Sequence, residues 1–270
     1  MMNQYSISLI ISTYNNPRFL ELVLLSVLKQ KLLPREVVIA DDGSGEETKE
    51  LIDIYKKTFP IPLLHVWHED NGYRLSTIKN KAVAIAASEY VIFIDGDLLL
   101  HPLFIFDYQK SIHRGYILVA SRAFLSKSFT QVLLNQKSCV VNFHRGIFEQ
   151  NMASAVRIPW LHHLVKGSTT YKGARGGLMG FFKKDYLSVN GLDEAFTGWG
   201  REDSDLFVRL LNSGIKRKNI KFSAITYHLW HPILSRDSLS INDTLLKNSI
   251  DTGSKWCKKG VDQYLAIHSL

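Results

Sequence analysis

Two carboxylates separated by one glycine, Asp95-Gly96-Asp97, interrupt the apolar run from Tyr90 to Leu100. A run of this composition is typical of a strand buried on both faces of a parallel sheet, where a charge is tolerated only at the strand end. Two acids this close repel each other, and a divalent cation bound by oxygen converts that repulsion into binding. The pattern therefore suits a Mg²⁺ or Mn²⁺ site, although Asp-Gly after a strand is also typical of a solvated turn.

A second group of acids, Glu202, Asp203 and Asp205, follows a Gly-Trp-Gly segment at 198–200. Apolar residues recur on one helical face from 206 to 211, so we predict a helix that begins at these acids. Acids in a first helical turn are stabilised by the helix dipole, which is the plain interpretation. An ordinary capping turn needs only one small residue, so it does not explain an aromatic residue between two glycines. A ligand-binding role for this segment therefore stays open.

Two histidines, His228 and His231, end a further predicted strand. Neutral imidazole binds Mn²⁺, and the acids at 95 and 97 lack a third protein ligand. Histidine also commonly fills space near strand ends, so both interpretations stay open. Four glycines between 171 and 180 indicate either tight turns or a close approach of the backbone to another group.

The elements that must position these residues alternate in type along the first hundred residues. Predicted strands at 6–12, 36–40 and 63–67 are each followed by a polar stretch and then by a helical apolar stripe, and Asn16-Pro17 suits a helix start. Such alternation predicts a mostly parallel sheet that binds ligands beyond the carboxyl ends of its strands. The polar residues expected at that edge are Asp41, Asp42, Arg74, Asp95 and Asp97.

Composition narrows the class of protein. The 270 residues are 46% hydrophobic, enough for a full core, and they contain neither 18 consecutive apolar residues nor a signal-peptide pattern. We therefore expect a cytoplasmic protein whose two distant cysteines are reduced. The net charge of +8 suits an anionic partner, but the basic residues are dispersed, which argues against nucleic acid.

Taken in order, these motifs resemble the inverting family-2 glycosyltransferases of the nucleotide-diphospho-sugar transferase (GT-A) fold, particularly bacterial capsule and lipopolysaccharide enzymes. The resemblance covers about residues 5–232. It rests on Ile-Ser-Thr-Tyr-Asn at 11–15, Asp-Asp-Gly-Ser at 41–44, Asn-Gly-Tyr-Arg at 71–74 with Lys79-Asn80, Asp-Gly-Asp at 95–97, and Gly-Trp-Gly-Arg-Glu-Asp at 198–203. The last segment is also similar to the Trp-Gly-x-Glu-Asp segment of β1,4-galactosyltransferases and chondroitin polymerase.

The resemblance implies an α/β fold with a Rossmann-like, mostly parallel central sheet flanked by helices. It implies metal-dependent transfer of a sugar, with inversion, from a nucleotide-diphosphate sugar, expected to be a UDP-sugar, to a glycan or lipid-linked glycan hydroxyl. Asp203 would be the general base, Glu202 and Trp199 would bind sugar, and Asp97 with His228 would hold Mn²⁺ or Mg²⁺, with His231 as the alternative ligand. The donor would contact Thr13, Tyr14, Asn15, Asp41, Asp42, Arg74, Lys79, Asn80, Asp95, Gly96, Gly176 and Gly177.

We expect a catalytic domain at 1–235, with a nucleotide-binding half at 1–100 and an acceptor-binding half at 101–235. A basic tail at 236–270 would pack on it, with Trp256 and Tyr264 as candidate anchors. Residues 126–171 lack a clear period and are expected to form long loops facing the acceptor. Their positive charge suits peripheral contact with an anionic membrane.

Other functions remain to be compared with this one. A sugar-phosphate nucleotidyltransferase would need a glycine-rich loop after the first strand, and residues 13–17 contain no glycine. A non-catalytic sugar-nucleotide binder, or a basic nucleic-acid-binding protein, would tolerate Asp203→Asn and would not depend on metal. Nothing in the sequence indicates the donor sugar, the acceptor or an oligomeric state.

Overall fold

The computed structural model of this chain describes residues 5–143, 145–172, 176–232 and 237–265. Its strands are β1 (Ile7–Thr13), β2 (Glu36–Asp41), β3 (Leu63–Trp67), β4 (Tyr90–Asp95), β5 (Leu98–Leu100), β6 (Tyr116–Val119), β7 (Ser121–Leu125), β8 (Phe148–Gln150), β9 (Leu178–Phe182), β10 (Lys216–Asn219) and β11 (Ile225–His228).

Helices lie between most of these strands. The α-helices are α1 (Pro17–Leu28), α2 (Glu46–Lys56), α3 (Leu75–Ile85), α4 (Phe104–Ser111), α5 (Lys127–Gln136), α6 (Lys183–Ser188), α7 (Glu202–Asn212), α8 (Leu239–Asp251) and α9 (Asp262–Leu265), and the 3₁₀ helices are η1 (Arg145–Ile147), η2 (Met152–Ala155) and η3 (Pro159–Leu164). The predicted start of α1 is confirmed, because the Asn16 side chain accepts a hydrogen bond from the Phe19 N–H and Pro17 follows it.

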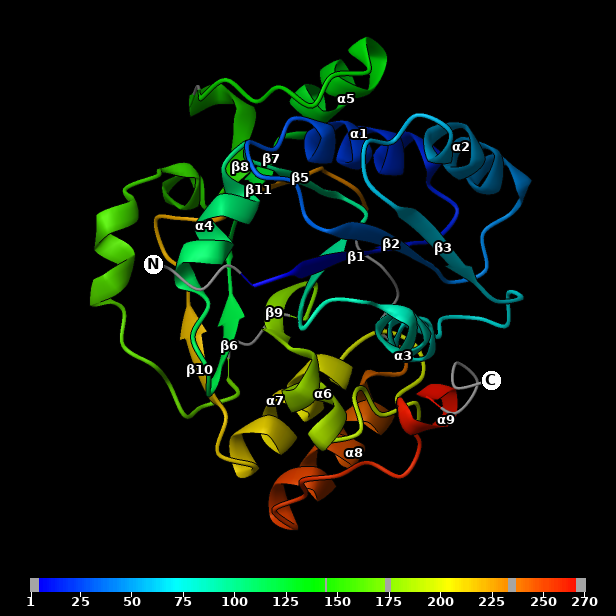
Figure 1. The fold of residues 1–270 in the computed structure, drawn as a ribbon, viewed down its shortest axis with the longest axis vertical. Coiled ribbons are helices and arrows are strands. Elements are labelled where there is room, and N and C mark those ends of the chain that lie inside the picture. The colour runs from blue at the N-terminus through cyan, green and yellow to red at the C-terminus, as the bar shows by residue number, and fades with distance from the viewer. Residues whose placement is uncertain (1–4, 144, 173–175, 233–236, 266–270) are drawn as a thin grey trace.

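The central sheet has seven strands in the order β10-β6-β9-β4-β1-β2-β3. All neighbours are parallel except β9, which runs antiparallel to both β4 and β6. The mostly parallel sheet predicted from the sequence is therefore confirmed. In Figure 1, α1 and α2 cover one face of the sheet, and α3, α6 and α7 cover the other.

Alternate residues of β1 supply the two halves of the core. Leu9 and Ile11 pack with the α1, α2 and α4 side, whereas Ile10 packs with the α3, α6 and α7 side. This alternation follows from the two-residue period of a strand, and it explains why the inner strands are apolar throughout. Because both faces are covered, polar side chains on these strands are confined mainly to their ends.

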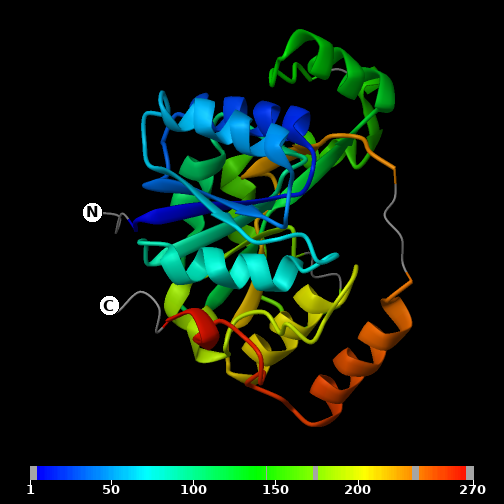
Figure 2. The ribbon, with the colours of Figure 1, turned by 90° about the vertical axis from the view of Figure 1, so that its right-hand side faces the viewer.

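A second sheet, in the order β5-β11-β7-β8, extends the molecule beyond the central one. It was not predicted, and it places His228 of β11 opposite Leu98 of β5, next to Asp97. The expectation of long loops throughout 126–171 is wrong at α5, where Ser126 caps a ten-residue helix that the aperiodic sequence had hidden. Figure 2 shows α5 and the chain that follows it standing out from the body of the molecule.

The segment after residue 236 contains two helices that pack on the rest of the structure. α9 lies beside α3, and the Tyr264 hydroxyl donates to Glu194 at 3.0 Å. The expectation for Trp256 is wrong, since this side chain is 52% exposed, whereas its neighbour Cys257 is buried. None of the helices in the described part of the chain has the length and apolar content that a membrane crossing requires.

Candidate active site

The ends of three neighbouring strands form one row of polar side chains. The register pairs Ser12 with Asp95 and Thr13 with Asp41 across β4, β1 and β2. The Ser12 hydroxyl also lies 3.1 Å from Asp95 Oδ1. The predicted gathering of acids at the carboxyl edge of the sheet is therefore present in the structure.

Two histidines contact the acids at the end of β2. His65 Nε2 lies 2.9 Å from Asp41 Oδ2, and His68 Nε2 lies 2.7 Å from Asp42 Oδ1. The other Asp42 oxygen accepts the Arg74 N–H at 2.9 Å, and burial raises the pKa of Asp42. Sequence reasoning missed both histidines. His68 directly follows β3, which could have indicated its place at the sheet edge, whereas His65 lies in the middle of that strand.

The loop after β1 is held against the loop after β2. Asn15 has a left-handed backbone (φ 44°), its N–H donates to Ser44 Oγ, and its side-chain oxygen accepts the Gly45 N–H. Tyr14 is 52% exposed, and its hydroxyl donates to Asp70 at 2.9 Å. Of the predicted residues in this loop, Tyr14 and Asn15 are exposed and open to a ligand, while Thr13 is buried.

Three residues that were predicted to contact the nucleotide-sugar donor, Arg74, Lys79 and Asn80, have different surroundings. Lys79 is 3% exposed, with its Nζ 3.4 Å from Asp95 Oδ1, and the Arg74 guanidinium donates to the Glu69 carbonyl. Asn80 is fully buried, and its amide bonds to Leu192, Glu194 and Tyr186. The structure thus leaves Asn80 no open path to a ligand and gives it the role of holding residues 186–194 against α3.

Gly176 and Gly177, which precede β9, lie between two carboxylates that are far apart in the sequence. The Gly176 N–H donates to Asp203 Oδ2 at 2.6 Å, and the Gly177 carbonyl accepts the Asp95 N–H at 3.0 Å. A Cβ at Gly177 would lie 1.6 Å from Asp95 Oδ2, and one at Gly176 would lie 2.2 Å from Asp203 Cβ. Only glycine fits at either position. Of the two interpretations of this glycine-rich stretch, the close approach of the backbone to another group is therefore the one that holds at these positions.

The start of α7 carries Glu202 and Asp203, as predicted. Burial, followed by the nearby Asp203 charge, raises the pKa of Glu202 to about 7, and burial also raises the pKa of Asp203. Opposing this, Asp203 accepts the N–H groups of Gly176 and Ser204, and the Lys79 ammonium favours the ionised form. Trp199, in the loop before α7, is 37% exposed.

Asp97 and both histidines of the predicted site come together. His231 Nε2 lies 2.9 Å and His228 Nε2 lies 3.3 Å from Asp97 Oδ2, and one ligand atom from each residue falls within 4.8 Å of the others. Burial opposes ionisation of Asp97, but His231, His228 and Arg122 together lower its pKa. Burial lowers the pKa of His228, which keeps it in the neutral form that binds metal.

This group fits a divalent cation of the Mn²⁺ type. Its donors are one carboxylate and two imidazoles, a set that suits first-row metals better than Ca²⁺. Asp97 Oδ1 is buried and has no hydrogen-bond partner among the described residues, which leaves one ligand atom to be satisfied. The arrangement can therefore hold a metal at Asp97, two residues after Asp95 at the end of β4.

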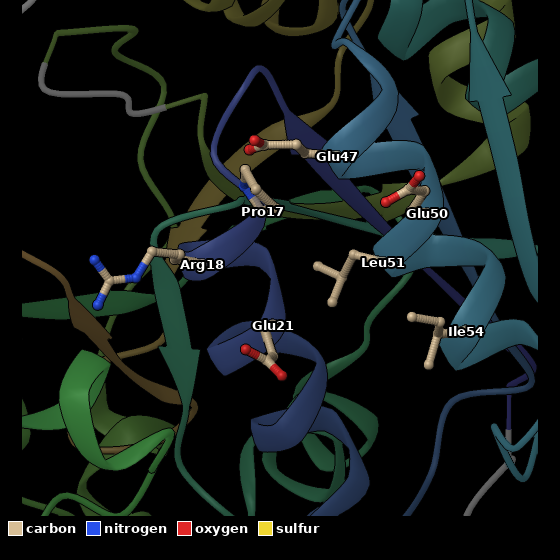
Figure 3. Close-up of a pocket in the computed structure, with 7 residues that line it drawn as sticks. All are labelled: Pro17, Arg18, Glu21, Glu47, Glu50, Leu51 and Ile54. Atoms are coloured by element: carbon tan, nitrogen blue, oxygen red, sulfur yellow. The ribbon is translucent and has the colours of Figure 1, made fainter.

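A separate cavity of about 230 Å³ lies between α1 and α2. Figure 3 shows its lining, in which Glu21, Glu47 and Glu50 accompany Arg18, Leu51 and Ile54. None of the predicted site residues contributes to it. The three glutamates would repel a diphosphate, and the cavity is separate from the row of acids at the sheet edge. We therefore assign it no part in the site.

Comparison with known proteins adds to this geometry. A family model described as glycosyl transferase family 2 matches residues 8–162, and one described as the N-terminal domain of galactosyltransferase matches residues 163–232. The chondroitin synthase of Escherichia coli is 28% identical over 238 residues, which are 82% of this chain and 34% of that protein. The chain thus spans about a third of the length of this relative.

Solved structures share the fold at low sequence identity. TarS 1–349 of S. aureus in complex with UDP aligns with a TM-score of 0.62 at 18% identity, covering 97% of this chain and 70% of that one. A mannosyltransferase of Pyrobaculum calidifontis in complex with GDP-Man and Mn²⁺ aligns with a TM-score of 0.60 at 16% identity, covering 89% and 61%. The fold is the GT-A fold, and the chain belongs to glycosyl transferase family 2.

Proposed function

We propose that this chain is a metal-dependent glycosyltransferase that moves a sugar, with inversion, from a nucleotide-diphosphate sugar to a glycan hydroxyl. The observation that carries the proposal is the placement of Asp203 and Asp95 against the Gly176-Gly177 backbone, with Asp97 two residues after Asp95. Acids at the end of β4, near a group that can hold a metal, suit a diphosphate leaving group, and an acid on α7 faces them across the glycines. Relatives named as polysaccharide synthases support the same class of reaction.

The donor would lie along the carboxyl edge of the sheet. Asp42 and the loop at 13–15 would contact the nucleoside, while Lys79 and Arg74 would offset phosphate charge. UDP is our choice of nucleotide, since one structural neighbour was solved with UDP. Asp97, His228 and His231 would hold Mn²⁺ or Mg²⁺, which supplies Lewis-acid stabilisation of the departing diphosphate.

Asp203 would accept the proton of the acceptor hydroxyl as that oxygen attacks the anomeric carbon. Inversion needs a base on the face opposite the leaving group, and a raised pKa brings a carboxylate closer to that task. Glu202 would bind sugar hydroxyls, and Trp199 would stack on a sugar face. The acceptor is a glycan or lipid-linked glycan, in keeping with surface polysaccharide or lipopolysaccharide synthesis at the cytoplasmic side of a membrane.

The decisive experiment combines binding and transfer. UDP with Mn²⁺ should raise the melting temperature of the wild type, and a UDP-sugar panel with chondroitin oligosaccharides and p-nitrophenyl glycosides should yield a transferred sugar. Asp203→Asn should reduce kcat by about 10² to 10⁴-fold while keeping the UDP-induced shift, because a general base contributes about that much. His231→Ala should lose the part of the shift that depends on Mn²⁺.

Two matched controls test whether these effects are specific. Asp53→Asn changes an exposed aspartate of α2, and His113→Ala removes an exposed histidine, so both should behave as wild type. Transfer at the wild-type rate by Asp203→Asn would exclude it as the base. Absence of a shift with every nucleoside diphosphate, with and without Mn²⁺, would contradict the whole proposal.

A further inference from the structure

The loop that presents Trp199 contacts α8, a helix that lies after the residues matched by the family models. A Cβ at Gly198 would lie 2.2 Å from Ser238 Oγ, and one at Gly200 would lie 3.2 Å from Leu239 Cδ1. The start of α8 therefore touches the loop on both sides of the tryptophan. Figure 2 shows α8, in orange, next to α7, in yellow.

One side chain of α8 bonds to this loop at two points. Asn242 is 1% exposed, and its Nδ2 donates to the Thr197 carbonyl at 3.1 Å and to the Gly200 carbonyl at 2.8 Å. The two acceptors flank Trp199 in the chain. A single amide group thus uses both of its N–H donors to fix the two ends of the tryptophan segment.

The backbone of this loop depends on such external bonds. Gly198, Gly200 and Arg201 all have positive φ angles, of 69°, 107° and 79°. Glycines make many other conformations accessible, and a left-handed arginine is unfavourable by itself, so the loop needs outside contacts to keep one shape. On its other side, the Gly198 N–H donates to the Tyr73 carbonyl at 3.3 Å, beside the donor half of the site.

α8 is itself fixed in place by packing against the two elements that adjoin the loop. Leu246 forms a small apolar cluster with Phe196, which precedes the loop, and with Val208 of α7. Its position is therefore tied to the helix that begins with Glu202 and Asp203. Asn242 is held at a defined point relative to these acids.

We propose that Asn242 is a positioning residue of the acceptor site that acts through Trp199. The inference rests on the proposed function, in which Trp199 stacks on a sugar face, and it takes that sugar to be the acceptor's. Without the two donors, the carbonyls of Thr197 and Gly200 lose their partners and the tryptophan leaves its presented orientation. α8 is then part of the acceptor site, although it supplies no group that touches substrate.

The first test needs no substrate. Hydrogen–deuterium exchange of the full chain is compared for Asn242→Leu and for Asn248→Leu, the same change at an exposed position of the same helix. Loss of the two bonds should speed exchange in the peptide covering 196–201 by about tenfold, with no change in the control. Asn242→Ser, which keeps a smaller donor, replaces the leucine variant if that one does not fold. Unchanged exchange at 196–201 overturns the proposal, whatever the activity of the protein.

The second test separates positioning from general structural damage. With the p-nitrophenyl glycoside or oligosaccharide that accepts sugar, Asn242→Leu should raise the acceptor KM about tenfold and leave the donor KM within roughly twofold of wild type. In a Trp199→Ala background the same change should add little, because both variants remove one interaction. Additive effects, or a fall in kcat with an unchanged acceptor KM, overturn the role through Trp199. If the wild type transfers no sugar, the proposed function fails, while the exchange result still decides whether Asn242 holds the loop.

Discussion

At the scale of single residues, the site is a set of carboxylates whose charges are only partly compensated. Lys79 is the buried cation that contacts Asp95, and its charge also favours ionised Asp203 and Glu202. Glu202 Oε2 is buried without a hydrogen-bond partner among the described residues. Burial without a partner disfavours the ionised form of this carboxyl. The free energy of unfolding should therefore depend on pH through Glu202.

Stability should fall as pH rises through the titration of Glu202. Its pKa is about 7 in the folded protein against an ordinary value of 4.5, so between these values the folded state keeps a proton that the unfolded state has lost. The loss of stability that comes from ionising Glu202 in the folded protein is absent below about pH 4.5 and complete above about pH 7. Glu202→Gln, which cannot ionise, should therefore raise the melting temperature at pH 8 and change it little at pH 5.

Thermal unfolding at the two pH values checks this, with Glu50→Gln as a control at an exposed position of α2. The control should have the same melting temperature as the wild type at pH 5 and at pH 8, because it leaves Glu202 in place. An equal effect of Glu202→Gln at both values would mean that packing, and not charge, dominates at this residue.

At the scale of elements, α7 is held by an ion pair that is out of contact with solvent. Arg209 and Asp205, one turn apart, are 1% and 0% exposed. The guanidinium also donates to the carbonyls of Val189 and Gly191, at 2.6 and 2.7 Å. The pair thus joins the helix that carries Asp203 to the turn after α6, and it restricts where the candidate base can lie.

Arg209→Met should destabilise the protein by about 3–5 kcal/mol, since removing one partner leaves the Asp205 carboxylate buried and uncompensated. Urea unfolding measures the change. Lys247→Met in α8 is the matched control, because it breaks a Lys–Asp pair of the same spacing that is exposed. Adding Asp205→Leu to Arg209→Met should recover part of the loss, and a double variant less stable than Arg209→Met would contradict this account.

At the scale of the whole molecule, net positive charge and exposed apolar surface both concentrate in residues 126–171, which we call the arm. It contains five Lys or Arg residues against a single Glu149. Trp160 and Phe143 are 68% and 58% exposed there, and Arg157 ties the arm to α4 through two hydrogen bonds to the buried Asp107. Exposed aromatics among basic residues suit the surface of an anionic membrane.

We therefore expect the protein to sediment with vesicles that contain phosphatidylserine and not with vesicles of phosphatidylcholine alone. High salt should release it, since screening weakens attraction to a charged surface. Trp160→Ala should weaken this binding, whereas Trp256→Ala, at an exposed tryptophan outside the arm, should not. Equal binding to both kinds of vesicle, or none to either, would contradict membrane contact through the arm.

Much of the fold followed from local patterns. Alternating strands and helices predicted the parallel sheet, because side-chain periodicity reports which faces are buried and right-handed crossovers place the carboxyl ends at one edge. Acids at 41, 42, 95 and 97 had to lie there, since a strand buried on both faces tolerates a charge only at its end. The helix at α5 escaped prediction, as only Thr130 and Leu133 are buried on it and its apolar stripe is weak.

The sequence by itself thus determined that this chain places acids at the carboxyl edge of a parallel sheet and begins a helix at Glu202. Only the tertiary structure decided which distant residues meet there. Gly176 and Gly177 come between Asp95 and Asp203 because β9 runs antiparallel to β4, and His231 joins His228 at Asp97 because β11 pairs with β5. Contacts of this kind join residues far apart in the chain, where no local spacing or propensity records the partner. The same holds for Asn242, whose type and position in a polar helix do not reveal that it holds the loop of Trp199.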